Sequence, residues 1–130
     1  MNVQRAAVSL FLFASLAVAC ERTPAPPPVV SSSKTRQLRL VDKADQVCMV
    51  NNQFMGRPQI PVEVEGRTYF GCCAMCKSRL AQDRAARMAI DPFSGREVDK
   101  SSAVIAQDQA GAVVYFENEA NFSSYQAAGS

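Results

Sequence analysis

The chain has 130 residues, a formal net charge of +2, 48% hydrophobic residues, and neither histidine nor tryptophan. Because the charge is close to neutral, the sequence offers no broad basic field for nucleic acid. The lack of histidine excludes a Ser-His-Asp or Cys-His hydrolase and removes a common ligand of transition metals. Any metal site must therefore use cysteine, methionine, carboxylate or backbone ligands.

Residues 1–19 have the pattern of a signal peptide. A short polar start with one positive charge, Arg5, precedes an apolar run at 6–19 that is too short to span a bilayer. The run ends in small residues directly before Cys20, and residues 16–20, LAVAC, resemble the bacterial lipobox. This resemblance implies cleavage before Cys20 and a lipid, with palmitate, on that cysteine. The alternative is ordinary cleavage after residue 19, which would leave Cys20 as a free thiol.

Residues 20–37 are expected to be the lipidated cysteine followed by a tether. The stretch 21–33 contains four prolines and three serines, so it should be extended and contribute nothing to a core. Glu21 stands where an aspartate commonly retains lipoproteins in the inner membrane. By this resemblance we expect a lipid anchor in the outer membrane, facing the periplasm, with the outer leaflet of the inner membrane as the alternative.

The folded part is expected to be a small α+β domain built from two tandem units, at 38–90 and 91–128. The pattern Tyr-Phe occurs at 69–70 and again at 115–116, each time at the end of a strand and before a helix. We expect hairpins from strands at 60–64 and 68–70, and at 104–106 and 113–116, with helices at about 72–89 and 119–127. The expected shared core consists of Leu80, Met88, Phe93, Val104, Val114, Phe116 and Phe122.

The cysteines of the first unit are the strongest functional signal. Cys48 precedes the hairpin, and the run 71–76, GCCAMC, follows it. If a helix begins near Cys72, then Cys72 and Cys76 lie one turn apart on one face. Thiolates and thioethers bind soft ions such as Cu(I) and Zn(II) better than Ca²⁺ or Mg²⁺. The expected ligands are Cys48, Cys72 and Cys76, completed by one of three further soft donors: Cys73, Met49 or Met75.

Two alternatives use the same cysteines without a metal. Four cysteines in a small exported domain also fit disulfides, and the spacing alone favours neither reading. Cys48 could pair with Cys72 or Cys76 in a structural lipoprotein stabilised by disulfides. Cys72, Cys73 and Cys76 could instead form the dithiol centre of a redox protein, although the βαβ context of a thioredoxin-like protein is missing.

The first unit resembles a TRASH domain, in which a cysteine is followed by a spacer and then by Cys-x3-Cys after an aromatic strand. Cys48, Cys72 and Cys76 match those positions, with a slightly long spacer. The run 91–95, DPFSG, and the later Tyr-Phe resemble the related YHS domain. That second unit has no cysteine, since Ser94 and Asn118 stand at the ligand positions and Arg96 at the position of the family's methionine.

These resemblances imply handling of a soft metal ion, with units similar to a zinc ribbon or treble clef packed as one domain. We expect a non-enzymatic, membrane-anchored module that binds Cu(I), with Zn(II) or Hg(II) as alternatives. Such a module would serve heavy-metal trafficking, sequestration or resistance. Its partners would be a metal efflux system or a metallochaperone. A single hairpin with one helix buries too little surface to be stable, so the cysteine-free second unit is expected to be a scaffold.

Overall fold

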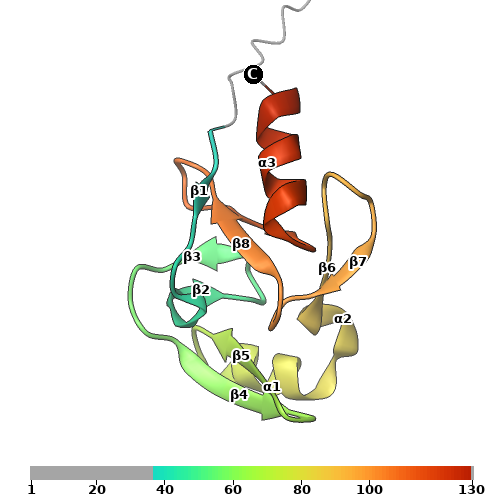
Figure 1. Ribbon diagram of the computed structural model, residues 1–130. Helices are drawn as coiled ribbons and strands as arrows, with labels where there is room; N and C mark the ends of the chain where they lie inside the picture. Colours follow the sequence, from blue (N-terminus) through green and yellow to red (C-terminus); the bar gives the residue numbers. More distant parts are fainter. Residues whose placement is uncertain (1–36, 130) are drawn as a thin grey trace, which may run out of the picture. The chain divides into compact units, whose positions relative to one another are not determined.

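The computed structural model describes residues 37–129, which form a mixed α+β fold of small hairpins and a few helices (Figure 1). The expected signal peptide, the lipidation site at Cys20 and nearly all of the tether lie outside the described residues. Within 37–129, no helix combines the length and apolar character that crossing a bilayer requires.

The first hairpin forms where the sequence indicated, and its helix begins two residues later than expected. Strands β4 (Ile60–Val64) and β5 (Arg67–Gly71) pair antiparallel, with Val62 opposite Tyr69. Glu65 and Gly66 connect them with φ angles of 52° and 75°. Positive φ at both central residues is the requirement of a tight type I′ turn, which matches the twist of the strands. Helix α1 (Ala74–Gln82) follows after Cys72 and Cys73.

The expected helix at 72–89 is wrong at its C-terminal end. Helix α1 stops at Asp83, which also caps a short second helix, α2 (Arg84–Arg87), by accepting a hydrogen bond from the backbone N–H of Ala85. A carboxylate that satisfies a free backbone N–H in this way starts a new helix instead of continuing the old one. The chain then forms β6 (Met88–Ile90), which pairs with β7 (Glu97–Asp99).

The second hairpin belongs to a three-stranded antiparallel sheet in the order β1-β8-β9. The sheet consists of β1 (Arg39–Leu40), β8 (Val104–Gln107) and β9 (Val113–Phe116). Helix α3 (Glu119–Ala128) follows β9. These bounds confirm the expected strands at 104–106 and 113–116 and the expected helix at 119–127.

A short two-stranded ribbon joins the two hairpins. It consists of β2 (Val47–Cys48), which follows a 3-10 helix (Ala44–Gln46), and β3 (Gln53–Phe54). The backbone N–H of Phe54 donates to the carbonyl of Gly111 at 2.8 Å, and the N–H of Val113 donates to the carbonyl of Asn52 at 2.9 Å. The ribbon that carries Cys48 is therefore hydrogen-bonded to the second hairpin.

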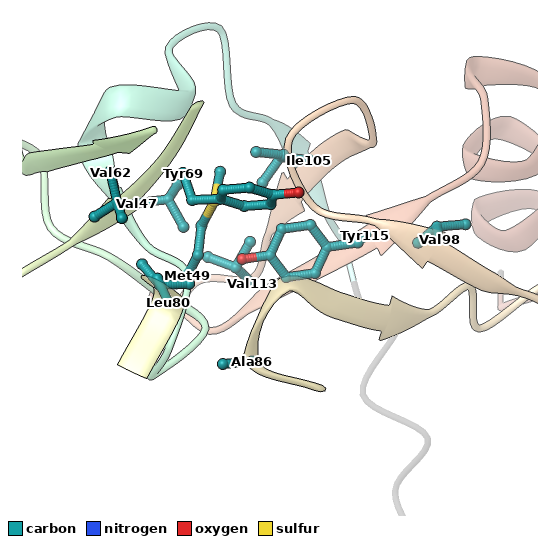
Figure 2. Close-up of a cluster of buried hydrophobic side chains, with 10 residues drawn as sticks. All are labelled: Val47, Met49, Val62, Tyr69, Leu80, Ala86, Val98, Ile105, Val113 and Tyr115. Carbon is teal, nitrogen blue, oxygen red and sulfur yellow. The ribbon is translucent and has the colours of Figure 1, made fainter. Parts of the chain in front are cut away.

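The main core draws on both halves of the described chain (Figure 2). Its ten buried members are Val47, Met49, Val62, Tyr69, Leu80, Ala86, Val98, Ile105, Val113 and Tyr115. A second cluster beside α3 contains Leu38, Ala106, Phe116 and Phe122. Burial of apolar surface from both halves is the main stabilising contribution to a chain of this size.

The expected core was partly wrong. Leu80, Phe116 and Phe122 are buried, but Phe93 is 49% exposed. Phe93 lies in the β6–β7 turn, where its backbone N–H bonds to the side chain of Asp91, so its ring is held away from the interior. The remaining three expected members, Met88, Val104 and Val114, are half-buried.

Candidate metal centre

Three elements bring three cysteines together. Cys48 ends β2, Cys72 lies between β5 and α1, and Cys76 lies in the first turn of α1. Their Sγ atoms all lie within 4.8 Å of one another. The Sγ of Cys76 is 3.9 Å from that of Cys48 and 3.6 Å from that of Cys72. Helix α1 begins at Ala74, later than expected, so Cys72 precedes the helix and still reaches Cys76.

The close approach of β5 to α1 depends on a glycine that the sequence analysis did not single out. A Cβ atom at Gly71 would lie 2.9 Å from the Cβ of Cys76 and 3.2 Å from the backbone nitrogen of Lys77. Both distances are shorter than ordinary van der Waals contact, so any larger residue would push the helix away. The only sequence signal was that the glycine directly precedes the cysteine pair.

The other soft donors of the sequence analysis lie elsewhere. Met49 is fully buried in the main core, and the side chain of Met75 is 81% exposed. Cys73 is exposed at the N-cap of α1; its thiol interacts with those of Cys72 and Cys76, but it is not one of the three cysteines whose Sγ atoms all lie within 4.8 Å of one another. The cysteines whose three Sγ atoms the structure brings within 4.8 Å of one another are therefore Cys48, Cys72 and Cys76.

The spacing of the sulfur atoms suits a thiophilic ion. Zinc–thiolate bonds are about 2.3 Å long, which gives sulfur–sulfur distances of about 3.8 Å in a tetrahedral site and about 4.0 Å in a trigonal one. The two distances given above, 3.6 and 3.9 Å, lie close to both values, and the third is at most 4.8 Å. All four described cysteines are free thiols, as metal binding requires.

The protonation of the thiols is governed by burial and by hydrogen bonds. Burial, with hydrogen bonding to neighbouring cysteines, raises the pKa of Cys76 to about 12. Burial also acts to raise the pKa of Cys48, but the backbone N–H groups of Asn51 and Cys72 outweigh it and lower that pKa. A hydrogen bond with Cys48 raises the pKa of Cys72. A metal ion would therefore have to displace protons from Cys72 and Cys76.

The turn that follows Cys48 is held from another part of the chain. The ammonium group of Lys100 donates to the carbonyl of Met49 at 2.6 Å and to Oδ1 of Asn52 at 2.8 Å. Lys100 is only 4% exposed. Sequence reasoning did not identify this lysine, because most lysines are exposed and nothing in the pattern marked this one.

The turn that precedes the second hairpin contains a buried carboxylate. Asp91, which is fully buried, accepts hydrogen bonds from the backbone N–H groups of Phe93, Ser94 and Glu117 and from Nδ2 of Asn121. Burial opposes ionisation, but these donors outweigh it and hold the pKa of Asp91 below its ordinary value. Hydrogen bonds thus connect the β6–β7 turn to the start of α3.

Comparison with protein-family models, with curated proteins and with solved structures gives no match. Function must therefore be inferred from the chemistry of the three cysteines and of the residues that hold them.

Proposed function

We propose that this chain is a membrane-tethered module that binds one soft metal ion through Cys48, Cys72 and Cys76. The observation that carries the proposal is the convergence of three Sγ atoms within 4.8 Å from parts of the sequence 28 residues apart. Three sulfur donors without histidine select a thiophilic ion. The ion we favour is Cu(I), which three thiolates can coordinate in a plane, with Zn(II) or Hg(II) as alternatives.

The uneven exposure of the sulfur donors supports a role in transfer as well as storage. Cys48 and Cys76 are buried, whereas Cys72 is partly exposed and its neighbour Cys73 is exposed. Met75, also exposed, lies in the first turn of the same helix. An incoming ligand can therefore approach from the Cys72 side, and Cys73 and Met75 offer soft donors on the way. We propose a non-enzymatic role in trafficking, sequestration or resistance, with an efflux system or a metallochaperone as partner.

The resemblance to TRASH and YHS domains belongs to the same proposal. Two hairpins, β4–β5 and β8–β9, are each followed by a helix, and this repeated order supports the proposal of a tandem of zinc-ribbon- or treble-clef-like units. We propose that the first unit, 38–90, is the metal-binding one and that the second, 91–128, is its scaffold. The lipobox-like segment at 16–20 and the tether support anchoring through Cys20 at the periplasmic face of the outer membrane.

Metal titration with thiol counting tests the proposal. The full-length protein, reduced and kept anaerobic in a mild detergent, would be titrated with Cu(I) and with Zn(II) against competing chelators. We expect one ion per chain and protection of three thiols from alkylation. Absence of binding by every soft ion tested would contradict the proposal.

The short distance between Cys72 and Cys76 favours one second candidate. Their Sγ atoms, 3.6 Å apart, need only a small movement to form a disulfide, so a redox or disulfide-stabilised protein uses the same residues. In that case the protein isolated under air would contain disulfides, and chelators would not change its stability. Thiol counts before and after reduction distinguish the two functions.

A further inference from the structure

Lys100, directly after β7, is a buried cation. Its ammonium group makes the two hydrogen bonds to the β2–β3 turn and lies 5.2 Å from the centroid of the Tyr115 ring. Burying a lysine costs free energy unless its charge is well paired. No carboxylate pairs with it among the interactions described for residues 37–129, so the charge itself requires an explanation.

The residues that Lys100 holds are those next to a proposed ligand. Met49 directly follows Cys48, and Asn52 occupies the left-handed region with a φ of 52°. A non-glycine residue in that region needs its surroundings to hold it. Burial lowers the pKa of Lys100 to about 8, while the charge of Cys48 acts in the opposite direction. The lysine is therefore both a clamp on the turn and a positive charge near the cysteine centre.

We propose that Lys100 is a positioning residue of the cysteine centre and that its charge favours a monovalent soft ion over a divalent one. The inference rests on the proposed function. Three thiolates leave a net charge of −2 around Cu(I) and of −1 around Zn(II). A fixed positive charge stabilises the first complex more than the second. If the ammonium group and the ion are about 8–10 Å apart and the effective dielectric constant is about 20, one unit of charge corresponds to roughly ten- to thirtyfold in affinity.

Other nearby cations do not replace this charge. The charge of Arg79 also acts on Lys100, but the Arg79 side chain is 63% exposed and lies 3.6 Å from Asp83. Lys77, next to Cys76, is exposed as well. Solvent screens exposed charges strongly, whereas a buried ammonium keeps most of its effect.

The test compares two ions in one protein. Affinities for Cu(I) and Zn(II) would be measured by chelator competition in the full-length, reduced protein and in Lys100→Met, which removes the charge at nearly equal length. We expect the ratio of Cu(I) to Zn(II) affinity to fall about tenfold or more. If Lys100 acted only as a clamp on the turn, its loss would lower the affinities for Cu(I) and Zn(II) equally and leave the ratio of the two affinities unchanged.

Three further variants make the result specific. Lys43→Met removes an exposed lysine and should leave the ratio unchanged. Asn52→Gly removes one hydrogen-bond acceptor of Lys100 but keeps the lysine charge, and glycine suits the positive φ at this position. The ratio of Cu(I) to Zn(II) affinity in this variant should therefore also match that of the wild type. If circular dichroism shows that Lys100→Met does not fold, Lys100→Gln retains a donor without the charge and should show the same fall.

The outcomes separate this inference from the proposed function. An unchanged ratio in a folded Lys100 variant, with wild-type binding intact, overturns the inference and leaves the metal module standing. Failure of the wild type to bind either ion overturns both.

Discussion

The two hairpin–helix units differ in the side chains that connect their first turn to their helix. In each unit, a turn that precedes the hairpin contacts the start of the helix that follows it. In the second unit this contact is made by the carboxylate of Asp91, which accepts four hydrogen bonds from the turn and from the start of α3. In the first unit the same contact is made by Cys48, Cys72 and Cys76.

This difference indicates which unit would gain more stability from a bound ligand. Charge-assisted hydrogen bonds to a buried carboxylate are short and strong, so the second unit is complete within the polypeptide. Thiols are weak hydrogen-bond donors and acceptors, so the three sulfur atoms of the first unit contribute little without an ion. A bound metal would do for the first unit what Asp91 does for the second.

The largest effect is expected when the sulfur cluster loses one donor. Cys76→Ser should lower metal affinity at least a hundredfold, because four-ligand zinc sites bind with about 10–16 kcal/mol and one thiolate therefore accounts for on the order of 3 kcal/mol. Chelator competition measures the loss. Ser78→Ala is the control, since Ser78 is exposed on the same helix and carries no sulfur, and the metal affinity of this variant should stay within about threefold of the wild type. Equal losses in both variants would show that the ligands are assigned incorrectly.

The next largest effect is expected at the carboxylate of the second unit. Asp91→Asn should lower the free energy of unfolding by about 2 kcal/mol in the presence of a chelator, because an amide nitrogen would face donors where an oxygen now accepts. Urea unfolding measures the change. In the control, Asp108→Asn, both backbone donors reach the same oxygen, Oδ1, which asparagine retains, so stability should hardly change. Metal affinity of Asp91→Asn should remain close to that of the wild type.

A smaller effect should appear in acid. Asp91 and Asp99 both have lowered pKa values in the folded protein. A carboxyl of this kind contributes stability that is present above its unfolded pKa, about 3.9, and is lost as the pH falls through its folded pKa. We therefore expect the metal-free protein to lose stability between about pH 4 and pH 2. Asp91→Asn should show a shallower dependence over the same range, and an unchanged slope would exclude Asp91 as a contributor.

The smallest effect is expected from restoring one cysteine to the second unit. Ser94→Cys should not create a second metal site, because Asn118 occupies the next ligand position and caps α3 through its own side chain. The stoichiometry should remain one ion per chain in a competition titration. Tight binding of a second ion would mean that the two units are more alike than their side chains indicate.

Much of the fold could be predicted because its signals are local. Alternating β-formers and a Glu-Gly pair mark the first hairpin, and the second hairpin and α3 follow the same rules. The three cysteines could be grouped from their spacing, because one lies before the hairpin and two lie four positions apart just after it.

The sequence-based predictions fail where contacts between residues distant in sequence determine the local structure. The stretch 84–89 is rich in helix-forming residues, so one long helix was expected there. Instead, Asp83 caps a new short helix, and residues 88–90 pair with β7. Lys100 is buried because it reaches a turn 48 or more positions away in sequence, and no local pattern reports that. The need for Gly71 depends equally on the position of α1, which the sequence alone does not fix.

X-ray absorption on the metal-loaded, full-length protein tests the central claim most directly. The proposed centre predicts a first shell of three sulfur atoms at about 2.3 Å from the ion. It also predicts the loss of one sulfur from that shell, or the loss of the bound ion, in Cys76→Ser. A first shell made mainly of oxygen or nitrogen, or one that is unchanged in Cys76→Ser, would contradict the account.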